Sequence, residues 1–208
     1  MYETDPDIIR TLKCVFIGSE EVGKTSLIVS YTTQGYPTKY VPTTFDNYSV
    51  VVNVDKKPIR IQLCDTAGQH KFDGIRPLSY PDCNVFIVVY SVINRRSFDE
   101  VMNRWMPEIS KVSPNIPVIL VGTQSDRRGW DYNISDCIST SRGKQLANQI
   151  RAVEFYECSA LTQENLKQMF DSVILAGLEE QKTFGKRPQT SKLKQGFQRL
   201  IHMTRRLM

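Results

Sequence analysis

The 208-residue sequence predicts an α/β fold in which six strands form a mostly parallel sheet flanked by helices. Strand-like runs alternate with helical patterns along the chain, which is typical of a parallel sheet covered by helices. The longest apolar run, residues 85–93, is too short to span a membrane and fits a buried strand. Hydrophobic residues make up 40% of the chain, enough for one domain with a substantial core.

The six strands are expected where apolar runs end at turn residues. The first run, LKCVFIG, reads as a buried strand, and a turn at residues 55–58 divides the longest run into two strands. The expected ranges are 12–18, two strands within 49–65, then 85–92, 117–122 and 154–160.

Two helices are marked by the residues that open them. Ser97 and Glu100 have the spacing of a capping box, which opens the segment SFDEVMNRWMPEISKV, and Pro107 should kink or shorten that helix. Thr162 is expected to cap a second helix over residues 162–181.

Charge divides the chain into an N-terminal extension (1–11), a domain (12–181) and a basic tail (182–208). Of the 27 lysines and arginines, eight follow Glu180, the last acidic residue, so the preceding part carries 19 bases against 22 acids. The positive charge therefore belongs to the tail. The domain has no basic excess that would favour binding to nucleic acid.

Nothing in the sequence indicates export. The N-terminal segment MYETDPDIIR is acidic and contains no apolar signal region. The five cysteines are an odd number and lack metal-site spacing, so we expect reduced thiols. The expected location is the cytoplasm, with peripheral association with the inner face of the plasma membrane through the tail.

A phosphate-binding motif follows the first predicted strand. Residues 18–25 match G-x-x-x-x-G-K-[ST] between a strand and a helical pattern. In such a loop, backbone N–H groups surround phosphate oxygens, Lys24 neutralises the outer phosphates and the Thr25 hydroxyl ligates Mg²⁺. On this motif alone, a glycine-rich turn is the alternative. The expected phosphate-binding residues are Gly18, Ser19, Glu20, Glu21, Val22, Gly23, Lys24, Thr25 and Ser26.

Three further segments, each after a later strand, argue against a bare turn. In CDTAGQ, Asp65 can hold a metal-bound water, the Gly68 N–H can meet a terminal phosphate, and Gln69 can orient an attacking water. In VGTQSD, the Asp126 carboxylate accepts hydrogen bonds from the guanine edge and repels the acceptor of adenine. In CSAL, the Ala160 N–H can face the guanine carbonyl. All lie at the carboxyl edge of the sheet, where open α/β folds bind ligands. The expected base-side residues are Thr123, Gln124, Asp126, Ser159 and Ala160.

Together, these four segments resemble the small GTPases, which implies the P-loop small-GTPase fold and hydrolysis of GTP to GDP and phosphate with Mg²⁺. YVPTTFDNYSV (40–50), DTAGQHKFDGIRPLSY (65–80) and ECSALTQENLKQMFD (157–171) are similar to the Rho family, and YTTQGYPTKY with VGTQSD to its Wrch/Chp subgroup. The resemblance implies signalling to actin and cell shape. It also implies guanine nucleotide exchange factors, activating proteins and Rho effectors as partners, with CRIB-type kinases among the effectors.

The resemblance also assigns roles to residues. Thr43 would be the effector-loop threonine that reaches Mg²⁺ and the terminal phosphate, within a first switch at residues 36–47, and residues 65–80 would form the second switch. Tyr36 would pack on the guanine, and Gln124 would lay its stem along the base. Catalysis would rest on Gln69, Lys24 and Thr43, and the metal on Thr25, Thr43 and, through water, Asp65.

Two acids depart from the Rho pattern, which has glycine and alanine at positions 20 and 21. Glu21 is expected to face solvent. Glu20 would lie beside the terminal phosphate, where it would displace Gln69 or exclude an activating arginine, which forfeits most of a rate gain of about 10³ to 10⁵. Its charge would repel the phosphate by roughly 4 kcal/mol at about 4 Å. We expect slow, activator-insensitive hydrolysis; an outward-pointing Glu20 with normal hydrolysis is the alternative.

Two more departures concern the C-terminal half. The segment RRGWDYNISDCISTS is several residues shorter than the helical insert of Rho proteins, and we expect Trp130 to pack down on the domain. The last cysteine is Cys158, and the chain ends MTRRLM, so no lipid attachment is expected.

Residues 192–208 of the tail, KLKQGFQRLIHMTRRLM, are expected to form an interfacial helix. Its basic residues lie outside the apolar arc and would each contribute about 1 kcal/mol of attraction to an anionic membrane. A calmodulin-type partner helix and a solvated tail are the alternatives. The apolar arc comprises Leu193, Phe197, Leu200, Ile201, Leu207 and Met208.

Two functions remain from the sequence. The first is a Rho-type GTP-binding switch that hydrolyses GTP, and the second is a largely GTP-bound interaction module. The complete DTAGQ segment favours the first and Glu20 favours the second. A P-loop kinase or ATPase is disfavoured by Asp126 and CSAL.

Overall fold

A computed structural model describes residues 10–37, 45–130, 132, 136–185 and 206–207 of the chain. The main elements are β1 (Arg10–Gly18), α1 (Lys24–Thr33), β2 (Phe45–Val54), β3 (Lys57–Thr66), β4 (Val85–Ser91), α2 (Arg95–Glu100), α3 (Met106–Val112), β5 (Val118–Thr123), α4 (Thr140–Gln149), β6 (Glu154–Glu157), α5 (Leu166–Gly185) and β7 (Arg206–Leu207). Short 3₁₀ turns cover His70–Phe72, Arg76–Ser79 and Ser125–Arg127, and a π-helical segment covers Val101–Trp105.

The strands form one sheet with the order β6-β5-β4-β1-β3-β2-β7. The pairs β1–β3, β1–β4, β4–β5 and β5–β6 are parallel, whereas β2 is antiparallel to both of its neighbours. The six predicted strands are confirmed, with ends that differ from the expected ranges by a few residues. The two-residue strand β7 was not predicted.

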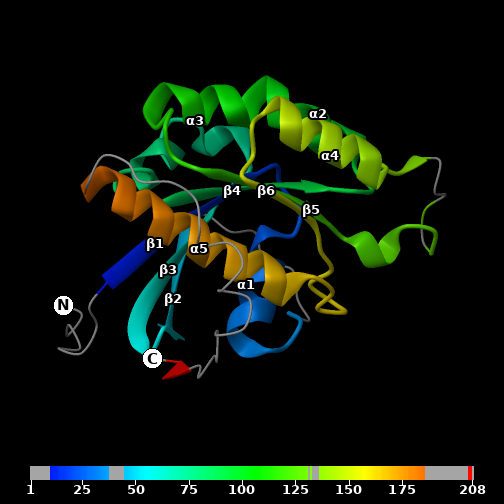
Figure 1. The fold of residues 1–208 in the computed structure, drawn as a ribbon. Coiled ribbons are helices and arrows are strands. Elements are labelled where there is room, and N and C mark those ends of the chain that lie inside the picture. The colour runs from blue at the N-terminus through cyan, green and yellow to red at the C-terminus, as the bar shows by residue number, and fades with distance from the viewer. Residues whose placement is uncertain (1–9, 38–44, 131, 133–135, 186–205, 208) are drawn as a thin grey trace.

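Helices cover both faces of the sheet, as Figure 1 shows. Helices α1 and α5 lie on one face, and α2, α3 and α4 lie on the other. Because side chains alternate along a strand, β4 sends Ile87 and Val89 into one core cluster and Phe86 and Val88 into the other. Burial of each such side chain contributes about 1.5–3 kcal/mol. The central strands are therefore a rigid base for the loops at their carboxyl ends.

Helices α2 and α3 form one helical stretch that passes Pro107 without a break. The expected shortening at Pro107 is therefore wrong, and the cause lies in the π-helical segment Val101–Trp105 directly before α3. Proline lacks the N–H that an α-helix interior requires, but it is tolerated in a first turn. Pro107 occupies that first-turn position of α3.

The last long helix begins later than expected. Thr162 does not cap α5, which starts at Leu166. Gln163 and Asn165 both have positive φ values, 63° and 55°, so the preceding residues cannot be helical. The Thr162 N–H instead donates to the Ser159 hydroxyl at 3.0 Å.

The tail differs from the expected helix where the structure describes it. Helix α5 continues to Gly185, past the predicted domain boundary at residue 181. Arg206–Leu207 form β7, antiparallel to β2, so these two residues are not part of an amphipathic helix. An edge strand presents unpaired backbone groups that accept any extended segment. The rest of the predicted helix, residues 192–205 and 208, lies outside the described residues.

Trp130 also differs from the expectation, because its side chain is 89% exposed. The Gly129 N–H donates to the Tyr132 carbonyl at 2.9 Å, and this closes a turn that holds Trp130 away from the domain. Arg127 lies over the Tyr132 ring at 5.1 Å in the same turn.

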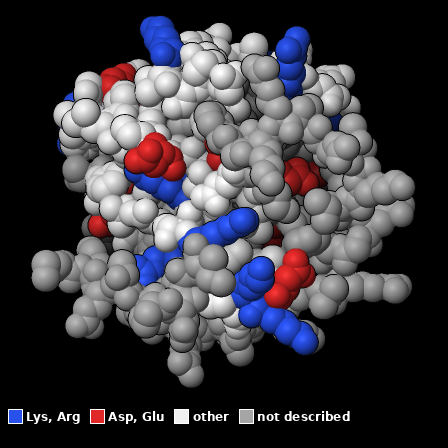
Figure 2. All heavy atoms as spheres, turned by 60° about the vertical axis from the view of Figure 1, so that its left-hand side comes forward, with Lys and Arg blue, Asp and Glu red and all other residues white. Residues whose placement is uncertain are grey.

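Charged side chains of both signs are interspersed over the described part of the face in Figure 2. On this face, several Lys and Arg side chains lie near Asp and Glu side chains. No helix among the described residues is long and apolar enough to cross a membrane.

Candidate functional site at the carboxyl ends of the strands

The loop between β1 and α1 depends on its glycines. A Cβ atom on Gly18 would lie 2.1 Å from the Val89 carbonyl oxygen, so only glycine allows β1 to end this close to β4. Gly23 has a φ of 90° directly before α1, in the left-handed region that favours glycine. No side chain caps the N-terminus of α1. Its first N–H groups are therefore directed at the loop, where an anion would bind.

Lys24 lies beneath this loop with only 7% of its surface exposed. Its Nζ donates to the Gly18 carbonyl at 2.8 Å and to the Ser19 carbonyl at 2.6 Å. Burial lowers the pKa of Lys24 to about 8, although Asp65 opposes the shift. A buried ammonium group is stabilised by a bound anion, which is the role predicted for Lys24.

Asp65 and Thr25 meet at the centre of the site. The Thr25 hydroxyl donates to the Asp65 carboxylate, which comes from the end of β3 and is fully buried. The sequence separates the two residues widely, and the parallel pairing of β1 with β3 brings them together.

Gly68 packs against the phosphate-binding loop. A Cβ atom on Gly68 would lie 2.4 Å from both the Glu20 nitrogen and the Ser19 carbonyl carbon, so any other residue would push the two segments apart. The backbone of Gly68 is thus held against the phosphate-binding loop.

A cavity of about 250 Å³ opens between these segments. It combines the loop before α1, the segment after β3 and one residue from the end of β5. Many predicted phosphate-side residues line it, together with Tyr36 and Gln124. Its lining comprises Glu20, Glu21, Gly23, Lys24, Thr25, Ser26, Tyr36, Pro37, Thr66, Ala67, Gly68, Gln69 and Gln124.

Two residues at the end of β5 join the loop to the base side. The Thr123 hydroxyl donates to the Val22 carbonyl at 2.5 Å and to the Tyr90 carbonyl at 3.0 Å. The Gln124 amide donates to the Glu21 carbonyl at 3.3 Å. These bonds hold Glu21 in a backbone conformation with φ 60°, which is costly for a residue other than glycine.

The remaining base-side residues lie near one another but do not line the cavity. The Ser125 N–H donates to the Cys158 carbonyl at 3.3 Å, which links the loop that carries Asp126 to the segment before Ser159 and Ala160. Asp126 is half-buried and Ser159 is fully buried. Of the predicted base-side residues, Gln124 lines the cavity, and Asp126 follows it by two positions.

The family model of the Ras family matches residues 13–178, more than half of the chain. The chain belongs to the Ras family of small GTPases. Ras-family domains are GTP-binding switches that generally hydrolyse GTP, bind the nucleotide with Mg²⁺, and interact with exchange factors, activating proteins and effectors.

The residues at the centre of the site fit a magnesium ion. Mg²⁺ prefers oxygen ligands and is usually held by one or two protein groups together with waters and substrate phosphates. The Thr25 hydroxyl and the buried Asp65 carboxylate are oxygen donors already in contact. No cluster of three or more His, Cys, Asp or Glu side chains within the described ranges could hold a metal, so the phosphates would complete the ligand set. Thr43, the third predicted ligand, lies outside the described residues.

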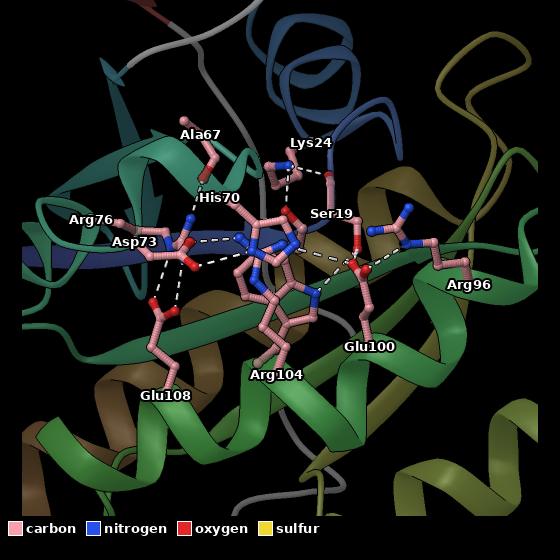
Figure 3. A network of polar contacts seen from close by, with 12 residues as sticks. Ser19, Lys24, Ala67, His70, Asp73, Arg76, Arg96, Glu100, Arg104 and Glu108 are labelled. Atoms are coloured by element: carbon pink, nitrogen blue, oxygen red, sulfur yellow. Dashed lines mark hydrogen bonds and ion pairs between the residues drawn. The ribbon is translucent and has the colours of Figure 1, made fainter.

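A network of charges that the sequence did not reveal supports the Ras-family site from below (Figure 3). Arg76 donates to both oxygens of Glu108 at 2.9 and 2.8 Å, to Asp73 at 2.5 Å and to the Ala67 carbonyl at 2.7 Å. Arg104 also donates to Asp73, at 2.6 Å. The bond to Ala67 holds the residue directly before Gly68.

Trp105 connects this network to the phosphate-binding loop. The guanidinium groups of Arg76 and Arg104 both lie over its ring, at 4.7 and 4.1 Å from the ring centroid. The Trp105 Nε1–H donates to the Ser19 hydroxyl at 3.3 Å, and that hydroxyl donates to Glu100 at 2.5 Å. The spacing of Glu100, Arg104 and Glu108, one helical turn apart each, is the signal that could have indicated one polar helix face.

Proposed function

We propose that this protein is a Rho-type molecular switch that binds GTP and GDP with Mg²⁺ and signals through effectors to actin and cell shape. The similarity of residues 40–50, 65–80 and 157–171 to the Rho family supports the subgroup. The observation that carries the proposal is that Lys24, Gly68 and Gln124, from three separate segments, line the same cavity. In this proposal the domain comprises residues 12–181.

The phosphate groups of the nucleotide would occupy the cavity end at α1. Lys24 holds a positive charge against the outer phosphates, and the Gly68 N–H contacts the terminal one. Thr25 and Thr43 would ligate Mg²⁺ directly and Asp65 through water, and the ion would neutralise charge that develops on the phosphates. Gln69 lines the same cavity and would orient the attacking water.

The Asp126 carboxylate would select guanine by accepting hydrogen bonds from its ring N–H and its amine. Titration calorimetry with Mg²⁺ tests this proposal: GDP and GTP should bind at least about a hundredfold more tightly than ATP, since charged hydrogen bonds contribute about 1.5–3 kcal/mol each. Asp126→Asn should remove most of the preference. Equal binding of ATP and GTP by the wild type would overturn the proposal.

We further propose that Glu20 slows activator-stimulated hydrolysis. Glu20 lines the cavity, and its backbone is in tight contact with Gly68, next to Gln69. A carboxylate in that space would displace Gln69 or exclude an incoming arginine. Single-turnover hydrolysis with a Rho-type activating protein should therefore rise at least about a hundredfold in Glu20→Gly, out of the 10³ to 10⁵ that such an arginine supplies. Strong stimulation of the wild type that Glu20→Gly leaves unchanged would contradict it.

A second candidate is a guanine-nucleotide-binding module that seldom hydrolyses GTP, and Glu20 is the observation that favours it. The nucleotide content of the purified protein separates the two. Mostly GDP indicates either a working cycle or a loop that binds GTP less tightly than GDP, whereas mostly GTP indicates the module.

The basic tail would bring the protein to an anionic membrane surface. Eight bases and no acids follow Glu180. Each contributes about 1 kcal/mol near such a surface. The full-length chain should float with phosphatidylserine vesicles, and a chain with its tail bases changed to glutamine should not. Equal flotation of both would exclude this role.

A further inference from the structure

Glu20, Glu21 and Gly68 line two neighbouring cavities and form a wall between them. Glu20 is the one of the two acids whose backbone is in tight contact with Gly68. On one side lies the nucleotide cavity described above. On the other lies a side cavity of about 160 Å³, which also contacts Asn94, Arg96 and Arg104. Because a wall residue borders both spaces, rotation of its side chain moves its charge from one to the other.

The backbone at this wall cannot move in the same way. The Glu20 nitrogen lies so near the Gly68 Cα that a Cβ there would approach it to 2.4 Å. Strain between the Glu20 carboxylate and a terminal phosphate must therefore be relieved by side-chain rotation. Glutamate has three rotatable side-chain bonds, and Glu20 is exposed.

The side cavity offers positive charge to a carboxylate. The Arg96 Nε donates to Glu100 at 2.8 Å, while the Arg96 side chain is 78% exposed at the rim. Arg104 lies deeper, 13% exposed, and is held by Asp73 and by the Trp105 ring. Figure 3 shows Arg96 and Glu100 side by side on one helix, below Ser19 of the phosphate-binding loop. Arg96 keeps most of its guanidinium group accessible, so it is the better hydrogen-bond donor to the carboxylate of a rotated Glu20.

We propose that Arg96 is a specificity-determining residue that receives the Glu20 carboxylate in the side cavity when a triphosphate fills the nucleotide cavity. This inference rests on the proposed function. GDP lacks the terminal phosphate, so it leaves Glu20 free to stay at the wall. Arg96 thus acts through Glu20 and sets how tightly GTP binds relative to GDP. The rotated side chain still lies next to Gly68, which borders the side cavity as well, so it keeps occupying the space that an activating arginine needs.

A double-mutant cycle tests this positioning role. Affinities for GDP and for a non-hydrolysable GTP analogue, both with Mg²⁺, are measured for the wild type, Arg96→Ala, Glu20→Gln and the double variant. Arg96→Ala should weaken analogue binding about three- to fivefold, as expected for an exposed ion pair, and change GDP binding less than about twofold. In the Glu20→Gln background, Arg96→Ala should have no such effect, because the coupled charge is gone.

Two further variants separate this role from a structural one. Arg95→Ala is the matched control, because Arg95 is the neighbouring exposed arginine on α2 and forms an equivalent pair with Asp99. It should leave both affinities unchanged. Arg96→Lys should keep most of the preference, since it keeps the charge.

The inference is overturned if Arg96→Ala weakens both nucleotides equally, or if its effect persists without the Glu20 charge. A wild-type protein that binds neither nucleotide would overturn the proposed function as well. A wild type that binds both without coupling would overturn this inference alone.

Discussion

Two arginine–glutamate pairs brace opposite halves of the candidate site, and they differ in burial. Arg76 binds both oxygens of Glu108 on the phosphate side, and its side chain is 1% exposed. Arg128 binds both oxygens of Glu157 on the base side, at 2.9 and 2.7 Å, and its side chain is 20% exposed. The geometry of the two pairs is nearly the same, so their surroundings decide what each contributes.

The surroundings separate the two halves by role. The deeper arginine is shared among Glu108, Asp73 and a backbone carbonyl, and it stacks on Trp105. The shallower one has Glu157 and one backbone carbonyl, at 2.7 Å. The phosphate half is therefore built around buried charged side chains, each of which needs the others as partners. The base half is more exposed to solvent, so substitution of one of its charged residues should lower the free energy of unfolding less.

Removal of Glu108 should have the largest effect. Glu108→Ala leaves the buried guanidinium group of Arg76 with only Asp73 as its acidic partner, and breaking a buried pair from one side costs about 3 kcal/mol. Urea unfolding monitored by circular dichroism measures the loss. A change below about 1 kcal/mol would mean that burial does not distinguish the two pairs.

Glu157→Ala tests the Arg128–Glu157 pair of the base half. It should lower the free energy of unfolding by about 1 kcal/mol. Arg128 is exposed enough to regain water, and it keeps its bond to the Ile138 carbonyl. The same urea titration applies, with Glu154→Ala as control, because Glu154 is an exposed glutamate on the same strand. A loss equal to that of Glu108→Ala would remove the distinction between the halves.

The fold and much of the phosphate side could be predicted from the sequence because their signals are local. Strand periodicity, the GxxxxGK[ST] spacing and the residues after each strand fix the position of Lys24 and Asp65 without knowledge of the packing. The Arg76–Glu108 pair could not be found in this way. The two residues are separated by 32 positions, and their contact depends on how helix α3 lies against the segment after β3.

Trp130 shows a second limit of sequence reasoning. Hydrophobicity alone predicts burial for tryptophan, but the backbone turn at Gly129 decides where the side chain points. The helix prediction is wrong at Arg206–Leu207 for a related reason. The open edge of β2 offers these two residues backbone partners, and this tertiary pairing overrides the local helical pattern there.

Asp73 makes the stability of the protein depend on pH, and this effect should be smaller than that of Glu108→Ala. Burial favours a higher pKa, but hydrogen bonds from Arg104, Arg76 and His70 outweigh it and lower the pKa of Asp73 from 3.8 to about 2. The folded state therefore binds its proton less readily than the unfolded state does. The stabilisation is complete above about pH 4 and is lost as the pH falls towards 2.

Unfolding of the wild type and Asp73→Asn between pH 6 and pH 2 measures this effect. The stability difference should be constant above pH 5 and should shrink below pH 4. Because the side chain is 43% exposed, solvent screening keeps the difference well below that of Glu108→Ala. A difference that grew as the pH fell would contradict the assigned direction of the shift.

The smallest effect is expected at Trp130, on the open side of the molecule. Because 89% of this side chain is already exposed, Trp130→Phe should change the free energy of unfolding by less than about 0.5 kcal/mol.

Fluorescence gives an independent readout, since the chain has only two tryptophans and Trp105 is fully buried. Acrylamide should quench one component of the wild-type emission strongly and one weakly. Trp130→Phe should remove the strongly quenched component and shift the remaining emission to shorter wavelength, because Trp105 is surrounded by protein. If the wild type showed no strongly quenched component, Trp130 would have to pack against the domain, as the sequence alone predicts.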